Sequence, residues 1–170
     1  IMKIKAVHSI KGVSKSLNSL LIDSVASGAS IGFIAPLSLK SAQDYWQGVD
    51  ADLTTPYRRL YLALDGATVI GSVQLSLCAK ANGAHRGEVE KLMVHSEHQG
   101  KGIAKQLMSN LESDAYTLGI KLLVLDTRQG DTASYLYRKL NYLEAGTIPD
   151  FAKSSTGELD ATVYFYKQLT

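Results

Sequence analysis

The spacing of apolar and polar positions changes several times along the chain and divides it into helices and strands. Residues 3–7 alternate between polar and apolar side chains, which predicts a half-buried first strand. The apolar positions that follow recur at spacings of three and four, which predicts a helix with one apolar face that ends near Gly28. A second helix is predicted to start after Ser38, as its N-cap, and to run to about Leu53.

The rest of the chain carries mostly strand patterns. Two β-rich runs, 59–64 and 68–78, are joined at Asp65-Gly66, a strong hairpin signal. The 121–126 run is almost continuously apolar, as is typical of a strand buried on both faces. The remaining predicted elements are strands at 88–95, 142–146 and 161–169 and helices at 100–118 and 131–140. The order β-α-α-β-β-β-α-β-α-β-β predicts an α/β fold of the mixed α+β kind, with helices on both faces of one sheet, in a single domain over residues 1–170.

Composition narrows the class of protein without identifying a partner. The chain is 45% hydrophobic and 20% charged, which is typical of a folded globular protein and excludes disorder and coiled coil. A net charge of +2 gives no indication of nucleic-acid binding. The single cysteine, Cys78, excludes a disulfide framework within the chain and a multi-cysteine zinc site. No apolar stretch approaches the ~20 residues that cross a bilayer and no signal-peptide pattern is present, so a cytoplasmic protein without a membrane partner is expected.

The glycines gather at one informative place, Gln99-Gly100-Lys101-Gly102, before a predicted helix. Unpaired N–H groups and the helix dipole make such a helix start an anion site, and the two glycines let a phosphate approach the backbone. The pattern is neither a P-loop nor a three-glycine dinucleotide fingerprint. An ordinary glycine-rich helix start remains the alternative interpretation.

Two motifs carry a resemblance to a known family. The sequence Gln99-Gly100-Lys101-Gly102-Ile103-Ala104 resembles the Q/R-x-x-G-x-G/A signature of the GNAT superfamily of acyl-CoA-dependent N-acetyltransferases, and it follows an apolar strand as that family's signature does. Residues 133–142 resemble the second motif, A-x-x-L-Y-x-K-x-G-F, with Asn141 in place of glycine and Tyr142 in place of phenylalanine. The resemblance implies a twisted, mostly antiparallel mixed sheet of about seven strands, acetyl-CoA as cosubstrate and no metal.

Four further segments are similar to a subgroup of this family, the tabtoxin resistance proteins, which acetylate a β-lactam toxin. The segments are 28–33, 74–78, 88–94 and 125–127. This similarity implies transfer of acetyl to a primary amine of a small molecule, with an antibiotic or toxin as one candidate. The Gly-x-Ser-x-Gly pattern of residues 28–32 lacks the strand-to-helix setting of a hydrolase elbow. By its position the segment is instead predicted to form a wall of the acceptor pocket.

Direct acetyl transfer needs a base for the acceptor amine and a proton donor for the leaving thiolate. Tyr137 lies at the family's general-acid position, although a core aromatic on an amphipathic helix fits it too. The resemblance implies a base or a substrate-binding carboxylate at Glu88 and a base at Asp126, whereas an acidic residue at a strand end often serves only as a loop cap. Glu90 shares Glu88's side of the strand and is the alternative base.

The resemblance also implies a set of cofactor-binding residues. Main-chain groups of Met93 and Val94 would hold the pantetheine arm. Lys139 is a candidate contact of the cofactor, although a solvated lysine is the simpler interpretation. The residues implied for the pyrophosphate are Gln99, Gly100, Lys101, Gly102, Ile103 and Ala104.

Other functional readings stay open. The same chemistry could act on a protein or peptide terminus, and a GNAT-like chain could bind CoA without catalysis. Trp46 and Tyr45 are candidate neighbours of the acceptor pocket, with Trp46 more simply a core residue. The tyrosine-rich segment 164–166 fits strand packing or a homodimer interface.

Overall fold

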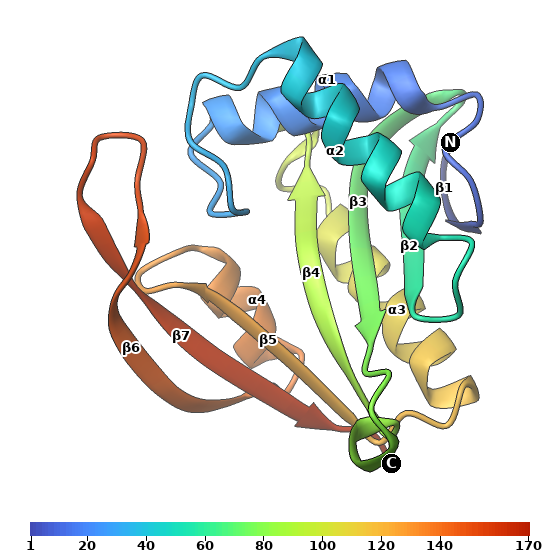
Figure 1. Cartoon of the computed structure of the whole chain (residues 1–170), viewed down its shortest axis with the longest axis vertical. Helices are drawn as coiled ribbons and strands as arrows, with labels where there is room; N and C mark the ends of the chain where they lie inside the picture. Colours follow the sequence, from blue (N-terminus) through green and yellow to red (C-terminus); the bar gives the residue numbers. More distant parts are fainter.

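The computed structural model describes residues 1–170 and shows one seven-stranded mixed sheet with four α-helices (Figure 1). The predicted order of elements is confirmed, and with it the mixed α/β class. In chain order the elements are β1 (Met2–Val7), α1 (Ser14–Ala26), α2 (Leu39–Asp52), β2 (Arg58–Asp65), β3 (Thr68–Leu77), β4 (Arg86–Val94), α3 (Ile103–Thr117), β5 (Leu122–Arg128), α4 (Ala133–Lys139), β6 (Leu143–Lys153) and β7 (Leu159–Gln168), with short 3₁₀ turns at Ala81–Gly83 and Ser96–His98. None of the helices combines the length and the apolar character needed to span a membrane.

The sheet opens in its middle. Its strand order is β1-β2-β3-β4-β5-β7-β6, and every neighbouring pair is antiparallel except β4 and β5. The parallel pairing is short, joining only Arg86–Glu88 to Leu122–Val124. Beyond it the two strands diverge, as Figure 1 shows, so the β5-facing edge of β4 has no strand partner from Val89 onward. This divergence creates the space in which the candidate site lies.

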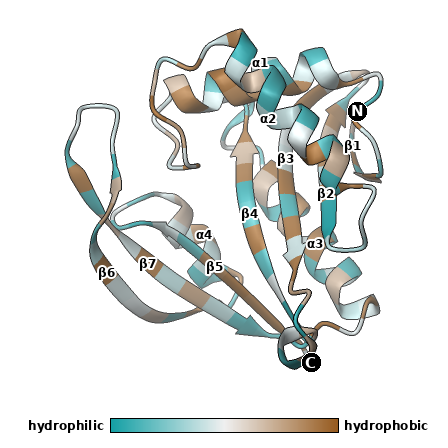
Figure 2. Ribbon diagram, viewed as in Figure 1, coloured by the Kyte–Doolittle hydropathy of each residue, from teal (hydrophilic) through white to brown (hydrophobic).

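Two apolar cores hold the sheet, one on each face. The first has 18 buried residues and joins the sheet to α3 and α4, and the second has 14 and joins it to α1 and α2. In Figure 2 hydrophobic and hydrophilic residues alternate along β3 and β4, as expected of strands whose faces meet different surroundings. Trp46 is 1% exposed and its indole N–H donates to the Leu17 carbonyl at 3.0 Å, so it is a core residue that ties α2 to α1.

Short-range sequence signals predicted most ends of the helices and strands correctly. Ser38 is the N-cap of α2, and its hydroxyl accepts a hydrogen bond from the Ser41 N–H at 3.1 Å. The Asp65-Gly66 hairpin joins β2 to β3, with Gly66 at φ 62°. Helix α4 has Thr132 rather than Asp131 as its N-cap, although the Asp131 carboxylate accepts from the Ala133 N–H at 3.4 Å. These are contacts within a few residues, which is why the sequence could predict them.

Three predictions were wrong in detail. Helix α3 begins at Ile103 rather than at 100, because Gly100 and Gly102 both have φ 76°, outside the helical region. Strand β6 continues to Lys153, well beyond the predicted end at 146, since its pairing with β7 extends to Leu159. Strand β5 is not buried on both faces: its residues alternate between buried and half-buried, because Leu122, Val124 and Asp126 face the open side of the sheet.

Candidate active site

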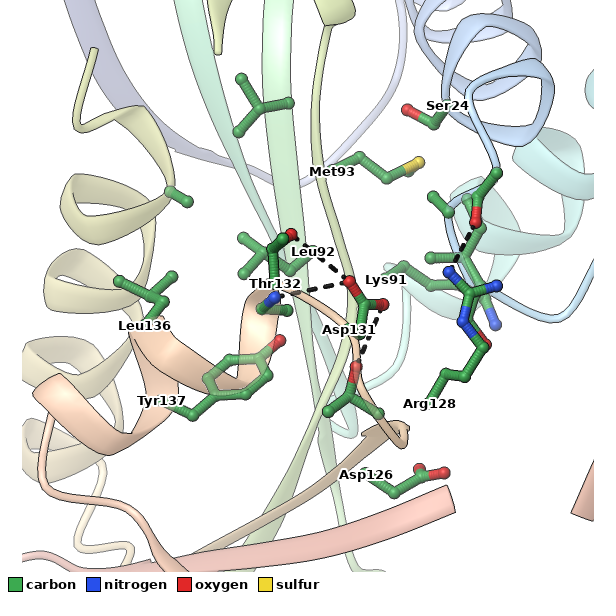
Figure 3. A pocket seen from close by; sticks show the side chains of 18 of the residues that line it. Ser24, Lys91, Leu92, Met93, Asp126, Arg128, Asp131, Thr132, Leu136 and Tyr137 are labelled. Atoms are coloured by element: carbon green, nitrogen blue, oxygen red, sulfur yellow. Dashed lines mark hydrogen bonds between the residues drawn. The ribbon is translucent and has the colours of Figure 1, made fainter. Parts of the chain in front are cut away.

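A cleft of about 1040 Å³ lies where β4 and β5 diverge. Its walls come from β4, the start of α3, the end of β5, α4, the 28–32 segment and the β6–β7 hairpin. Figure 3 shows side chains from several of these elements, with Tyr137 on one side of the cleft and Lys91 and Arg128 on the other. Elements far apart in sequence therefore contribute to one concave site, which is the usual form of a small-molecule pocket.

The start of α3 is suited to binding an anion. Gly100 and Gly102 hold left-handed backbone conformations, and a Cβ at either position would meet no atom within 4 Å, so the backbone there is open to a ligand. No side chain caps the helix and its first turn has no acidic residue. The free N–H groups and the positive end of the helix dipole are consequently left for a phosphate.

The cofactor-binding candidates fall mostly on the cleft. Seven of the eight line it: Met93, Val94, Gln99, Gly100, Gly102, Ile103 and Ala104. Lys101 does not line the cleft and its side chain is exposed. The Met93 side chain is 2% exposed within the α1/α2 core, so Met93 can offer a ligand mainly its backbone. Gln99 donates to the Val94 carbonyl at 3.3 Å, which fixes the glycine turn against the end of β4.

Glu88 and Asp126 lie on the same side of the opening. Glu88 is the last residue of β4 that pairs with β5, opposite Val124, and Asp126 follows Val124 by two residues on the same face. Burial raises the pKa of Glu88, and repulsion from Glu90 and Asp126 raises it further, although Lys91 opposes this. The Asp126 carboxylate accepts a hydrogen bond from the Thr162 hydroxyl at 2.7 Å, which holds it toward the cleft.

Glu90 also lines the cleft, but it is tied into a polar network whose other members do not line it. Its carboxylate receives a hydrogen bond from the Arg58 guanidinium at 3.1 Å, and Arg58 also donates to Gln74 at 2.7 Å. Gln74 is fully buried and donates to the Tyr45 hydroxyl at 2.9 Å. Tyr45 is thus part of this network and, like Trp46, does not line the cleft. Glu90 is thus held in an ion pair, whereas the carboxylate of Glu88 has no hydrogen-bond donor in the structure.

Tyr137 lies on α4, with its ring buried and its hydroxyl turned toward the cleft (Figure 3). The ring is 6% exposed and packs against Tyr142 and Phe165, which fixes its direction. Burial raises the pKa of Tyr137, and the nearby carboxylates Asp131 and Asp126 raise it further. The hydroxyl makes no hydrogen bond to the protein, so it stays protonated and available to a ligand.

Sequence reasoning missed two cations in the cleft. Lys91 has φ 56° at a bulge in β4, and its ammonium lies 5.8 Å from the centre of the Phe33 ring. Arg128, at the end of β5, donates to the Gly28 carbonyl at 3.1 Å. No local pattern could have marked either residue, because their partners lie in a segment that is distant in sequence.

The 28–32 segment lies on the cleft, where the sequence predicted a pocket wall. The loop that contains it is fixed at both of its ends. Arg128 holds Gly28, and the Ala35 N–H donates to the Ser155 hydroxyl of the β6–β7 turn at 2.9 Å. The two contacts narrow this end of the cleft from above.

Comparisons with known proteins agree with this geometry. Residues 31–142 match the model of the "Acetyltransferase (GNAT) family". An uncharacterized N-acetyltransferase from Azospirillum brasilense is 30% identical over 109 residues, which cover 63% of each chain, and a Yersinia pestis acetyltransferase is 33% identical over 82 residues, which cover 48% of this chain and 55% of its own. The chain thus spans about 63% and 55% of the lengths of these two relatives.

Solved structures show the same fold at low sequence identity. An N-acetyltransferase from Staphylococcus aureus superposes with a TM-score of 0.80 at 17% identity, covering 100% of this chain and 99% of its own. A putative acetyltransferase from Salmonella typhimurium, solved with its cofactor acetyl-CoA, gives 0.78 at 18% identity, covering 100% and 95%. At these identities the likeness shows a shared fold.

Proposed function

The chain belongs to the acetyltransferase (GNAT) family, and from this premise we propose that it transfers an acetyl group from acetyl-CoA to a primary amine of a small molecule. Transfer is direct, by attack of the amine on the thioester within a ternary complex. One observation supports the proposal: Glu88, Asp126 and Tyr137 all line the cleft where β4 and β5 diverge, which also includes a helix start without a side-chain cap. These groups supply a base, an orienting carboxylate and an acid within a single cleft.

Acetyl-CoA would lie along the unpaired edge of β4. The α3 start offers N–H groups to the pyrophosphate, and the backbone of Met93 and Val94 offers hydrogen bonds to the pantetheine arm. The glycines support this assignment because they leave open space where phosphate oxygens must approach. Lys101 contributes only general positive charge, since it is exposed and does not line the cleft.

Glu88 is the proposed general base. Its raised pKa makes it a stronger proton acceptor than an ordinary carboxylate, and it is not committed to an ion pair. It would take a proton from the acceptor ammonium, while Asp126, held by Thr162, would orient the nitrogen. The amine lone pair then forms the new C–N bond at the thioester carbonyl carbon.

Tyr137 is the proposed general acid. Backbone N–H groups on the open edge of β4 would stabilise the oxyanion of the tetrahedral intermediate. When the C–S bond breaks, the sulfur would take the electron pair and a proton from the Tyr137 hydroxyl, and the second proton of the nitrogen would pass through water to restore Tyr137 as the amide forms. A buried, protonated tyrosine suits this step, because the hydroxyl does not ionise before the thiolate needs it.

The shape of the acceptor end favours a small acceptor over a peptide. An extended peptide needs an open groove along the sheet edge. Here the loop that contains 28–32 bonds to Arg128 and to the β6–β7 turn, and so links the two sides of the cleft at its acceptor end. Within this proposal, an antibiotic or toxin amine is a candidate acceptor that rests on the resemblance of segments such as 88–94 alone.

The test follows CoA thiol release with acetyl-CoA and a broad panel of amines and peptides. Transfer to small amines is expected, and Glu88→Gln should lower kcat about 100-fold or more. Glu97→Gln is the matched control, because Glu97 is an exposed carboxylate on the turn after β4 and does not line the cleft. Bound acetyl-CoA without any thiol release would reject catalysis in favour of a CoA-binding module. Preferential transfer to peptides would reject the small acceptor.

A further inference from the structure

Two positively charged side chains reach the same short segment of the acceptor wall. Arg128 donates to the carbonyl of Gly28, and a Cβ at Gly32 would lie only 3.2 Å from the Lys91 ammonium nitrogen. Both side chains are half-buried, and both line the cleft. One comes from β4 and the other from β5, so the fold brings together on this segment two cations that are 37 positions apart in the sequence.

Neither cation has a counter-ion. No Asp or Glu oxygen lies within 4.0 Å of Lys91 or Arg128, whereas Arg58, Arg59, Arg138 and Lys167 are all ion-paired. Two half-buried like charges without a carboxylate partner repel one another and lose part of their hydration. In a concave wall they also concentrate positive potential where a ligand enters.

The backbone of β4 is distorted at this position. Between the pairs Gln74–Glu90 and Ser72–Met93, β4 has one residue more than β3, and Lys91 takes the left-handed conformation. A non-glycine residue in that region carries backbone strain, and such residues cluster at active sites and ligand-binding sites. The ring of Phe33 lies against the ammonium, which orients the lysine without neutralising it.

We propose that Lys91 and Arg128 form an anion subsite for a carboxylate of the acceptor, so that the substrates are amines that also carry a carboxylate. The inference rests on the proposed function and deepens it. In the productive pose Glu88 and Asp126 would face the ammonium of such a molecule, and the two cations beside the 28–32 segment would face its carboxylate. A reversed orientation is repelled at both ends, so the charges select the productive pose.

A single carboxylate fits this subsite better than a phosphate dianion. The planar guanidinium of Arg128 can donate hydrogen bonds to both oxygens of a carboxylate, and the Lys91 ammonium adds one point charge. Asp126, Asp131 and Asp160 also line the cleft, and they repel a second negative charge on the ligand.

The test compares acceptors in matched pairs. The probes are the common L-α-amino acids and the ω-amino acids from glycine to 6-aminohexanoate, each paired with its carboxamide. The quantity measured is the ratio of kcat/KM for the acid to kcat/KM for the amide, from thiol release. The acid and the amide of a pair differ in the basicity of their amines, which by itself affects the ratio. This effect is the same in every variant, so the decisive result is the change of the ratio between the wild type and a variant.

Removing a charge-assisted contact should lower the ratio about tenfold or more for the best acid. Lys91→Gln should do this through the KM of the acid, with the KM for acetyl-CoA unchanged, and Lys91→Arg should restore the preference. Lys91→Glu should reverse it, so that a diamine of equal length becomes the better substrate. Lys105→Gln, which removes a charge from the α3 side of the same cleft, is the matched control and should keep the wild-type ratio.

A second experiment measures ligand binding at the subsite without turnover. N-acetyl derivatives of the same amino acids, and their amides, are titrated calorimetrically into the protein saturated with CoA. Lys91-dependent binding of the acids, in the absence of transfer to any amine, would reject the proposed function and keep the anion subsite. Transfer with the same acid-to-amide ratio in the wild type and Lys91→Glu would overturn the subsite and keep the function. Failure of both transfer and binding would overturn both.

Discussion

The contact between strand β3 and helix α3 can be tested at Gly71, where a single methyl group has no room. Gly71 lies in β3, opposite Val94 of β4. A Cβ at this position would lie 3.0 Å from the Met93 carbonyl oxygen and 3.2 Å from methyl groups of Ile103 and Leu107. These neighbours belong to the proposed pantetheine strand and to the first turns of α3, so Gly71→Ala displaces both parts of the cofactor site.

The size of the effect follows from these distances. Comfortable separations between carbon atoms are about 3.5–4.0 Å, so the neighbours must move by a few tenths of an ångström. Ile103 and Leu107 are at most 4% exposed and have no free space to move into, and the Met93 carbonyl is backbone. Overpacking of this kind costs about 1–3 kcal/mol, of which about 0.4–1 kcal/mol is offset by the stiffer unfolded chain. At about 2–4 °C per kcal/mol, this net loss of at most about 2.6 kcal/mol should lower Tm by up to about 10 °C.

The assay combines thermal unfolding with steady-state kinetics. Gly71→Ala should raise the KM for acetyl-CoA more than the KM for the acceptor, because the displaced atoms lie along β4 and at the start of α3. Gly48→Ala is the matched control: Gly48 lies inside α2, with no atom within 4 Å of a Cβ and no positive φ. There alanine should stabilise the fold by about 0.5–1 kcal/mol and leave both KM values unchanged. A Tm for Gly71→Ala at or above that of the wild type would refute the reasoning.

Three further predictions concern the cleft. Tyr137→Phe should lower kcat about 100-fold and leave acetyl-CoA affinity within about twofold, because only the proton donor is lost; calorimetric titration with acetyl-CoA separates the two effects. Gly102→Glu should weaken acetyl-CoA binding about tenfold or more through bulk and negative charge at the phosphate site, whereas Gly102→Ala should show only the milder effect of the left-handed backbone. Glu90→Gln should move the acidic limb of the pH profile of kcat/KM to lower pH, because Glu90 repels the Glu88 carboxylate and raises its pKa. A lower pKa keeps Glu88 deprotonated at lower pH, so activity extends downward, measured with one acceptor amine throughout.

For each of these three predictions, one experimental result would contradict it. Unchanged turnover in Tyr137→Phe removes the tyrosine from the mechanism. Equal acetyl-CoA affinities for the Glu and Ala variants of Gly102 would place the phosphates elsewhere. A limb that moves to higher pH in Glu90→Gln would show that Glu90 does not act on the titrating group through its charge.

Parts of the candidate site that depend on local sequence could be predicted without the structure. The Gly100/Gly102 turn was found because glycine, helix start and preceding strand are adjacent in the chain, although the exact start of α3 was not. Tyr137 was found through a motif within one short helix. In contrast, the sequence could not decide whether Glu88 or Glu90 is the base, because both lie on the same side of one strand. What separates them is Arg58, whose ion pair with Glu90 comes from a different strand.

The sequence by itself determined the order of strands and helices, the hairpin at Asp65-Gly66, the N-cap at Ser38 and the family, because each depends on residues close together in the chain. Only the tertiary structure decided that β4 and β5 part after Glu88, since loss of pairing between two strands leaves no local pattern. It also brought Lys91 and Arg128 to one segment of the cleft without a counter-ion. The charges of a site add up through space, and the chain order says nothing about which of them meet.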